Sequence, residues 1–88
     1  MRQIKTTKAF DKKLSKYIKR YPDVLSKLSF VFKTMQIDIF DHLLNTHKLK
    51  GDMKNYCACT VTYSHRLCFR YDEYFIYLES VGSHDEVY

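Results

Sequence analysis

From position 8 to position 35, hydrophobic and polar residues recur with the period of a helix. From position 8 to position 21 the apolar residues form one stripe at i, i+4, i+7, i+8 and i+11, and lysines fill the opposite face. The stripe consists of Phe10, Leu14, Tyr17, Ile18 and Tyr21. Thr7 stands just before it, and a threonine hydroxyl can accept a hydrogen bond from the first turn of a helix. This pattern predicts an amphipathic helix capped at Thr7.

A second helix is expected after Pro22. Proline is favoured at the first position of a helix, because the N–H that it lacks would have no intrahelical partner there. The apolar residues that follow again share one side, namely Leu25, Leu28, Phe32 and Met35, widened by Val24 and Val31. The two helices therefore form a hairpin whose apolar faces are available to a sheet.

The second half of the chain has a different pattern. Residues 38–53 lose the helical period, and we expect a connecting loop with a turn at Gly51. From Asn55 onward Tyr, Cys, Thr, Val and Phe are frequent, as in strands. We expect strands at residues 2–6, 55–63, 66–72 and 74–81. The order β-α-α-β-β-β predicts an α+β fold, with the helical hairpin packed on one face of a small, twisted, mainly antiparallel sheet.

The first hairpin of this sheet decides which residues share a face. If the chain turns at residues 64–65, Tyr63 faces Arg66 and alternate residues point to the same side. One side then holds Cys57, Cys59, Val61, Arg66, Cys68 and Arg70, and the other holds Tyr56, Ala58, Thr60, Thr62, Leu67, Phe69 and Tyr71. The second set is more apolar, so we expect it to pack on the helices and the arginines to point outward. The aromatic residues of the last strand are expected to be mostly core and not a platform on which bases stack.

The length of 88 residues suits a single domain over residues 1–88 with one core. No apolar run approaches the roughly 20 residues that span a bilayer, and the first ten residues lack the apolar segment of a signal peptide. We therefore expect a soluble, cytoplasmic protein without membrane contact. Three cysteines indicate free thiols in a reducing compartment. The spacing of Cys57 and Cys59 is not that of a structural zinc site, so we expect neither a metal nor a cofactor.

Charge is distributed unevenly along the chain. Residues 1–33 contain ten Lys or Arg and two acidic residues, a net of +8, whereas the other 55 residues have five basic and eight acidic groups, a net of −3; together these give the total of +5. Such asymmetry indicates a polyanion or an acidic protein as partner. A solvated basic helix face is the alternative that composition leaves open.

Short motifs in the last forty residues resemble the RelE/ParE superfamily of toxin–antitoxin toxins, nearest the RelE- and YafQ-like messenger-RNA interferases. The motifs are "HKLKG" at 47–51, Tyr56, "RLCF" at 66–69, "SVG" at 80–82 and "EVY" at 86–88. The resemblance implies a cytoplasmic endoribonuclease that cuts messenger RNA on the ribosome without a metal and is silenced by a cognate antitoxin. In this chemistry the 2′-OH of the substrate attacks the adjacent phosphate. It requires a proton acceptor, a positive charge and a proton donor.

The resemblance also implies roles for individual residues. Arg66 matches the arginine that binds the scissile phosphate. His84 matches a histidine that transfers protons, and His47 matches a second acid/base group in a loop. Tyr88 matches a terminal aromatic residue that stacks on a base and orients the phosphate. The implied RNA-binding residues are Lys48, Lys50, Lys54, His65 and Arg70.

One departure from the family pattern lies in the strand at 55–63. RelE-like relatives have two lysines at the positions of Cys57 and Cys59, and a thiol cannot supply their permanent charge. Apolar packing is the usual role of a strand cysteine, and a thiolate that acts as a base is the alternative. Two other functions therefore stay open. One is inhibition of DNA gyrase, as in ParE-like members, and the other is a decayed toxin that retains only antitoxin binding.

Overall fold

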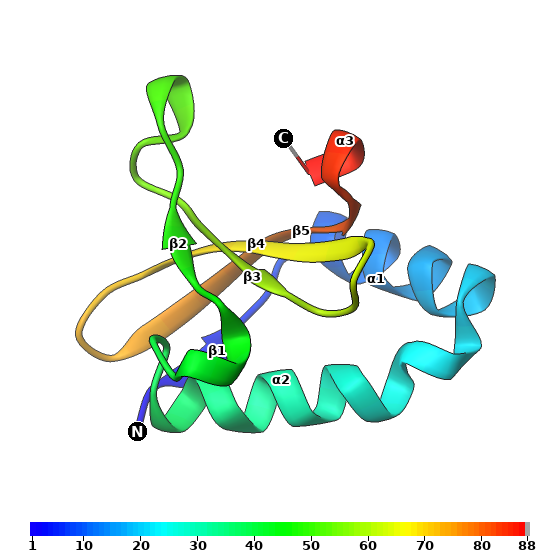
Figure 1. Cartoon of the computed structure of the whole chain (residues 1–88), viewed down its shortest axis with the longest axis horizontal. Coiled ribbons are helices and arrows are strands. Elements are labelled where there is room, and N and C mark those ends of the chain that lie inside the picture. Colours follow the sequence, from blue (N-terminus) through cyan, green and yellow to red (C-terminus); the bar gives the residue numbers. More distant parts are fainter. Residues whose placement is uncertain (88) are drawn as a thin grey trace.

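The computed structural model describes residues 1–87, except for the side chains of Asp52, Asp85 and Glu86. Its helices and strands run in the order β1 (Gln3–Lys5), α1 (Lys8–Arg20), α2 (Leu25–Ile37), β2 (His47–Lys48), β3 (Cys57–Thr60), β4 (His65–Tyr71), β5 (Phe75–Ser83) and α3 (His84–Val87). Figure 1 shows α2 beneath the twisted sheet and α3 above it. None of the helices formed by residues 1–87 is long and apolar enough to cross a membrane.

The two long helices form where the apolar stripes fall. Thr7 Oγ1 accepts a hydrogen bond from the Phe10 N–H at 3.1 Å, so the predicted cap of α1 is confirmed. A 3-10 turn at Pro22–Val24 then leads into α2. The helical hairpin and the α+β fold are therefore confirmed.

The sheet has five strands in the order β1-β5-β4-β3-β2. β1 pairs with β5 in parallel, and the other pairs are antiparallel, as expected of a mainly antiparallel sheet. The prediction of four strands is wrong in one respect. His47 and Lys48 lie in the segment that we expected to be a loop, yet they pair with Ala58 and Cys57 as an edge strand. Two residues are too few to produce an alternating pattern.

The register that we predicted for β3 and β4 is wrong. Arg66 pairs with Thr60 and not with Tyr63, a slip of three residues. The physical reason is a longer turn, in which the His65 carbonyl accepts hydrogen bonds from the N–H groups of Val61 and Thr62 at 3.0 and 3.3 Å. An odd slip exchanges the two faces of a strand. β3 is therefore inverted relative to our prediction.

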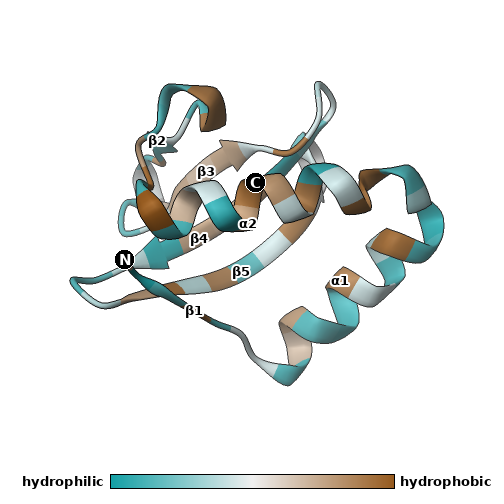
Figure 2. Cartoon of the chain, turned by 90° about the horizontal axis from the view of Figure 1, so that it is seen from below, coloured by the Kyte–Doolittle hydropathy of each residue, from teal (hydrophilic) through white to brown (hydrophobic). Residues whose placement is uncertain are grey.

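The core lies between the helical hairpin and one face of the sheet. Cys57 and Cys59 point into it from β3 and are 3% and 0% exposed, whereas we expected them on the side of the arginines. Their neighbours in the core include Phe10, Leu28, Met35, Leu67, Phe69 and Ile76. Figure 2, seen from the helix side, shows α2 crossing in front of the strands. Each large apolar side chain buried here stabilises the fold by about 1.5–3 kcal/mol.

A β-bulge in β5 sets the alignment of its second half. Cys68 pairs with Ser80 but Phe69 pairs with Leu78, so Glu79 is an extra residue in β5. Because of this insertion Leu78 and Val81, three positions apart, both face the helices and are buried.

Candidate functional site

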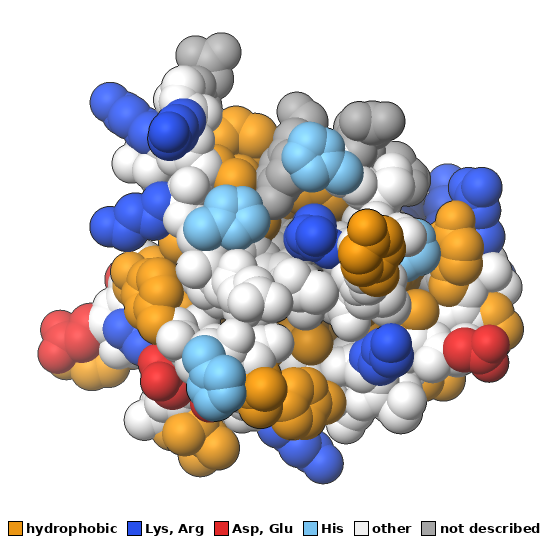
Figure 3. Space-filling model, viewed as in Figure 1, with side chains coloured by type: hydrophobic (Ala, Val, Ile, Leu, Met, Phe, Trp, Pro, Cys, Tyr) orange, Lys and Arg blue, Asp and Glu red, His pale blue; other side chains and the backbone are white. Residues whose placement is uncertain are grey.

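The face of the sheet opposite α1 and α2, called here the open face, gathers polar residues from neighbouring strands. Strand pairing places His47, Ala58, Cys68 and Ser80 in one row across it, and Thr60, Arg66 and Gly82 in the next. α3 turns back against β4 and β5, and its Val87 is buried outside the core cluster. This short helix therefore covers part of the open face. Figure 3 shows histidine and basic side chains over the upper half of the molecule, around α3 and the β2–β3 segment.

Arg66 lies on β4 in this face and is half-buried. Its Nη1 donates hydrogen bonds to the backbone carbonyls of Thr62, Tyr63 and His65 at 2.9, 3.2 and 3.0 Å. Among the described residues, every hydrogen bond of this guanidinium is made by Nη1. The turn thus holds one end of a planar donor whose other N–H groups can bind an anion.

Gly82 lies directly opposite Arg66 on β5. It is buried and has a φ of 153°, a conformation that residues with a side chain rarely adopt. A side chain at this position would point to the open face beside the guanidinium. The backbone conformation of this residue, the partner of Arg66, therefore favours glycine.

His84 follows Gly82 by two residues, at the start of α3, and is exposed. Because Gly82 is the partner of Arg66, the end of β5 delivers the imidazole to the same end of the sheet as the guanidinium. Our sequence prediction placed these two groups together, and the strand pairing is consistent with it. Tyr88, the third group of that prediction, lies outside the described residues.

His47 belongs to the same face through its pairing with Ala58. Its Nδ1 lies 3.2 Å from the carbonyl oxygen of Asn45. Because a carbonyl only accepts, Nδ1 is the donor in this contact. Two strand spacings, about 10 Å, separate His47 from the strand of Arg66.

The predicted RNA-binding residues are distributed over different surfaces. Lys48 and Lys54 line a pocket of about 290 Å³ with Tyr56 and Tyr71. Lys50 is exposed just before a 3-10 turn.

Arg70 and His65 lie on opposite faces of β4. Arg70 is on the open face, four residues from Arg66. His65 instead faces the helices, where its Nδ1 is 2.8 Å from the Tyr17 hydroxyl and its ring lies 4.5 Å from that of Tyr21, centroid to centroid. The ring thus contacts Tyr17 and Tyr21, and its role in RNA binding stays a prediction. Alternation with the apolar Leu67 and Phe69 is the sequence signal that places His65 on the helix side.

The three cysteines are buried thiols. Burial raises the pKa of Cys59 to about 12 and of Cys68 to about 11, with Arg66 and a hydrogen bond from Ser80 acting in the opposite direction. Burial also raises the pKa of Cys57, against the charge of Lys48. A thiolate base is therefore disfavoured, and the two β3 cysteines act as small core residues.

We expect the thiols of the folded protein to resist alkylation by iodoacetamide at pH 8. With a pKa of about 12, about 1 in 10,000 Cys59 side chains is a thiolate at that pH. Mass spectrometry should show no adduct in buffer and three adducts in urea. Because folding favours the protonated thiols, their contribution to stability is present below pH 9 and is lost as the pH rises toward 11–12. Rapid labelling of Cys59 without denaturant would contradict this.

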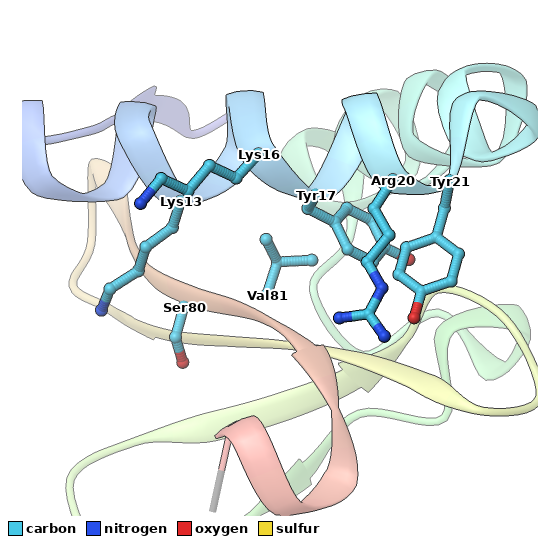
Figure 4. A pocket seen from close by; sticks show the side chains of 7 residues that line it. All are labelled: Lys13, Lys16, Tyr17, Arg20, Tyr21, Ser80 and Val81. Carbon is cyan, nitrogen blue, oxygen red and sulfur yellow. The ribbon is translucent and has the colours of Figure 1, made fainter.

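A second polar feature is a groove of about 360 Å³ between α1 and β5. Lys13, Lys16 and Arg20 line it from α1, together with two tyrosines, and Ser80 and Val81 form its β5 side. Figure 4 shows Lys13, Arg20 and Tyr21 extending from α1 toward β5. In the described part of the chain no Lys or Arg forms a salt bridge, since the one ion pair joins His42 to Asp41. The positive charge of the groove is therefore available to a partner.

The described residues contain no group of three or more His, Cys, Asp or Glu side chains that could hold a metal ion. At its Arg66 end, the open face offers the guanidinium of Arg66 and the imidazoles of His47 and His84. Such a set can bind an anion and transfer protons on either side of it.

Comparisons with known proteins identify the family of the chain and match its fold. A family model described as "Bacterial toxin of type II toxin-antitoxin system, YafQ" matches residues 2–88. Among solved structures, the E. coli DinJ–YafQ complex matches with a TM-score of 0.82 and 20% identity, over 100% of this chain and 99% of the other. The YoeB dimer from Staphylococcus aureus gives 0.78 and 17%, over 94% and 97%. A conserved hypothetical protein from Helicobacter pylori gives 0.64 and 28%, over the full length of both chains. No curated protein matches.

Proposed function

The chain belongs to the YafQ family of toxins from bacterial type II toxin–antitoxin systems, and we propose that it is an endoribonuclease that cuts messenger RNA in the ribosomal A site. The reaction is attack of a ribose 2′-oxygen on the adjacent phosphorus. The P–O5′ bond breaks, and the products are a 2′,3′-cyclic phosphate and a 5′-hydroxyl. One proton leaves the 2′-OH and another is delivered to the departing 5′-oxygen.

The open face has a group for each part of this reaction. The Arg66 guanidinium binds the phosphate and stabilises the charge that develops on its oxygens. Of His84 and His47, one imidazole accepts the 2′-OH proton and the other donates to the 5′-oxygen. Tyr88 orients the phosphate and stacks on a neighbouring base.

The single observation that best supports this proposal is the pairing of Arg66 with Gly82. It places a cation beside a residue without a side chain, with His84 two positions further along the chain. A phosphate bound by the guanidinium therefore lies near the end of β5, which leads into His84.

Primer extension on a translated message tests the function. After induction of the wild-type protein, we expect new 5′ ends inside codons of the translated region and none when translation initiation is blocked. Purified ribosomes programmed with the same message and mixed with the protein should give the same new 5′ ends. No metal ion should be needed other than those that the ribosomes require. Growth arrest with an intact message would exclude the proposal.

One observation keeps the gyrase alternative worth testing. On the open face β3 contributes Ala58 and Thr60, which have no charge, so this strand still lacks the lysines of RelE-like relatives. A supercoiling assay with purified gyrase separates the two functions. Inhibition of gyrase together with uncut message would favour a ParE-like inhibitor, and neither activity would favour a protein that only binds its antitoxin.

The two proposed partners are the ribosome and a cognate antitoxin. We assign the basic groove to ribosomal RNA, because three cations line it beside two aromatic rings. The YafQ protein of E. coli was crystallised with DinJ, and by analogy an antitoxin neutralises this chain.

Reversing two charges in the groove tests this assignment. The Lys16→Glu, Arg20→Glu double variant should bind ribosomes more weakly, and its log affinity should depend less steeply on log salt concentration, by about 0.7 for each phosphate that the groove no longer neutralises. Sedimentation with ribosomes at several salt concentrations measures both quantities. Lys33→Glu, an exposed change on α2, is the control. Unchanged ribosome binding together with weaker antitoxin binding would assign the groove to the antitoxin instead.

A further inference from the structure

The open face ends, near the β4–β5 hairpin, in alternating cations and aromatic rings. Lys5 and Arg70 both pair with Tyr77, one from β1 and one from β4, so these three side chains lie in one row. Lys5 Nζ is 4.0 Å from the centroid of the Phe75 ring, and Arg70 Cζ is 4.2 Å from that of Tyr77. The centroids of the two rings are 6.0 Å apart. We call these four residues the aromatic platform.

A carboxylate fixes the Tyr77 ring in place. Asp72 Oδ2 accepts a hydrogen bond from the Tyr77 hydroxyl at 2.7 Å, and Oδ1 accepts from the N–H groups of Tyr74 and Phe75 at 2.9 and 2.8 Å. The bond from Tyr77, followed by the two backbone bonds, lowers the pKa of Asp72, and the same side-chain bond raises the pKa of Tyr77. The ring is therefore ordered before any ligand arrives, which reduces the entropic cost of binding.

The β4–β5 turn explains the position of Asp72, but it does not explain the positions of the four platform residues. A turn of this kind requires a carboxylate and two N–H groups, and it needs neither an aromatic ring at Phe75 nor a cation from β1. Lys5 and Arg70 are exposed, and neither forms an ion pair with a described carboxylate. Cations next to accessible aromatic rings are the arrangement that single-stranded nucleic acids bind, through their phosphates and the flat faces of their bases.

We propose that the aromatic platform binds single-stranded messenger RNA next to the linkage that is cut, an inference that rests on the proposed ribonuclease function. A base stacks on the Tyr77 ring or on the guanidinium plane of Arg70 above it, and Lys5 contacts a phosphate of the same strand. Stacking accepts any base, so this contact supplies affinity without a sequence preference.

The distance along β4 fits this path. Arg70 and Arg66 lie on the same face four residues apart, which is about 13 Å at the usual rise of a strand. About four nucleotides stacked at 3.4 Å cover this distance. An RNA strand bound at Arg66 therefore reaches the platform across the same face of the sheet.

The platform corrects our expectation that the aromatic residues of the last strand are mostly core. Ile76 and Leu78 are buried against the helices, but Phe75 and Tyr77 alternate with them and are half-buried on the open face. The alternation was visible in the sequence as "FIYL". This alternation places Phe75 and Tyr77 on the face opposite the buried Ile76 and Leu78.

Fluorescence anisotropy with an unstructured, fully 2′-O-methylated RNA oligonucleotide tests the platform. The methyl groups prevent cleavage, so binding is measured independently of catalysis. Tyr77→Leu should weaken binding about 5- to 150-fold, which corresponds to the loss of one stacked base. Tyr77→Phe is the matched control, because it removes the bond to Asp72 but retains the ring, and it should lose much less affinity than Tyr77→Leu. Tyr74→Leu removes an exposed aromatic residue of the adjacent turn and should also have no effect.

The binding results test the platform independently of the proposed ribonuclease activity. If Tyr77→Leu binds as tightly as Tyr77→Phe, or if the wild type does not bind the oligonucleotide, the platform is not an RNA site. Equal loss in both Tyr77 variants would assign the residue to the hairpin and overturn the proposal. RNA binding that depends on Tyr77 in a protein that leaves messenger uncut would uphold the platform while rejecting the ribonuclease.

Discussion

Replacement of His84 by alanine is expected to slow messenger cleavage about 100- to 10,000-fold, the usual effect of removing one acid/base group. The side chain is exposed at the start of α3, so its removal leaves the core intact. Thermal unfolding should therefore change little. Single-turnover cleavage on programmed ribosomes measures the rate, and growth after induction measures toxicity.

The control for this variant is His42→Ala. His42 is also an exposed histidine, with 89% of its side chain accessible, and its one ion pair is to the adjacent Asp41. It lies in a 3-10 turn before β2, outside the proposed site, and its loss should leave cleavage unchanged. Equal activity of the two variants at the wild-type rate would remove His84 from the mechanism.

The helices could be predicted because their signals are local. The spacing of Phe10, Leu14 and Tyr17 depends only on the helical period, and the Thr7 cap acts on the N–H of a residue three positions away. Such features need no knowledge of the rest of the fold.

The faces of β3 could not be predicted, because they depend on a turn whose length the sequence does not reveal. A turn over residues 61–64 exchanged the sides of Cys59 and Thr60. The arginines of β4 were nevertheless assigned correctly to the outward side, since Leu67 and Phe69 alternate with them and must be buried. Alternation within one strand was reliable, and pairing between strands was not.

The bulge in β5 connects this register to the proposed site. With Glu79 inserted, Arg66 pairs with Gly82 and Leu67 pairs with Val81. Without the bulge, the pairing seen near the hairpin turn, such as Phe69 with Leu78, would continue along both strands. Val81 would then lie opposite Arg66, and Gly82 would face the core. The extra residue therefore places the glycine on the open face and the valine on the core face, and the sequence has no local signal for it.

Substitution of Arg66 by lysine is expected to reduce cleavage about 100- to 1,000-fold even though the positive charge is retained. The guanidinium is held by its Nη1 on three turn carbonyls and presents its remaining N–H groups in a fixed plane. A single lysine ammonium group cannot donate to the turn carbonyls and at the same time bind a phosphate through two parallel N–H groups. The loss should appear in the single-turnover rate more than in ribosome affinity, because the groove on α1 is unchanged.

Arg20→Lys is the matched control for Arg66→Lys. It makes the same chemical change at an exposed position of α1, keeps the charge of the groove, and should cleave at the wild-type rate. The turn carbonyls lose their partners in Arg66→Lys alone, so we also expect a modest decrease in its free energy of unfolding, about 0.5–1.5 kcal/mol for each hydrogen bond that water does not replace. A fully active Arg66→Lys would show that charge alone suffices at this position, and a planar donor beside Gly82 would then have no role in the reaction.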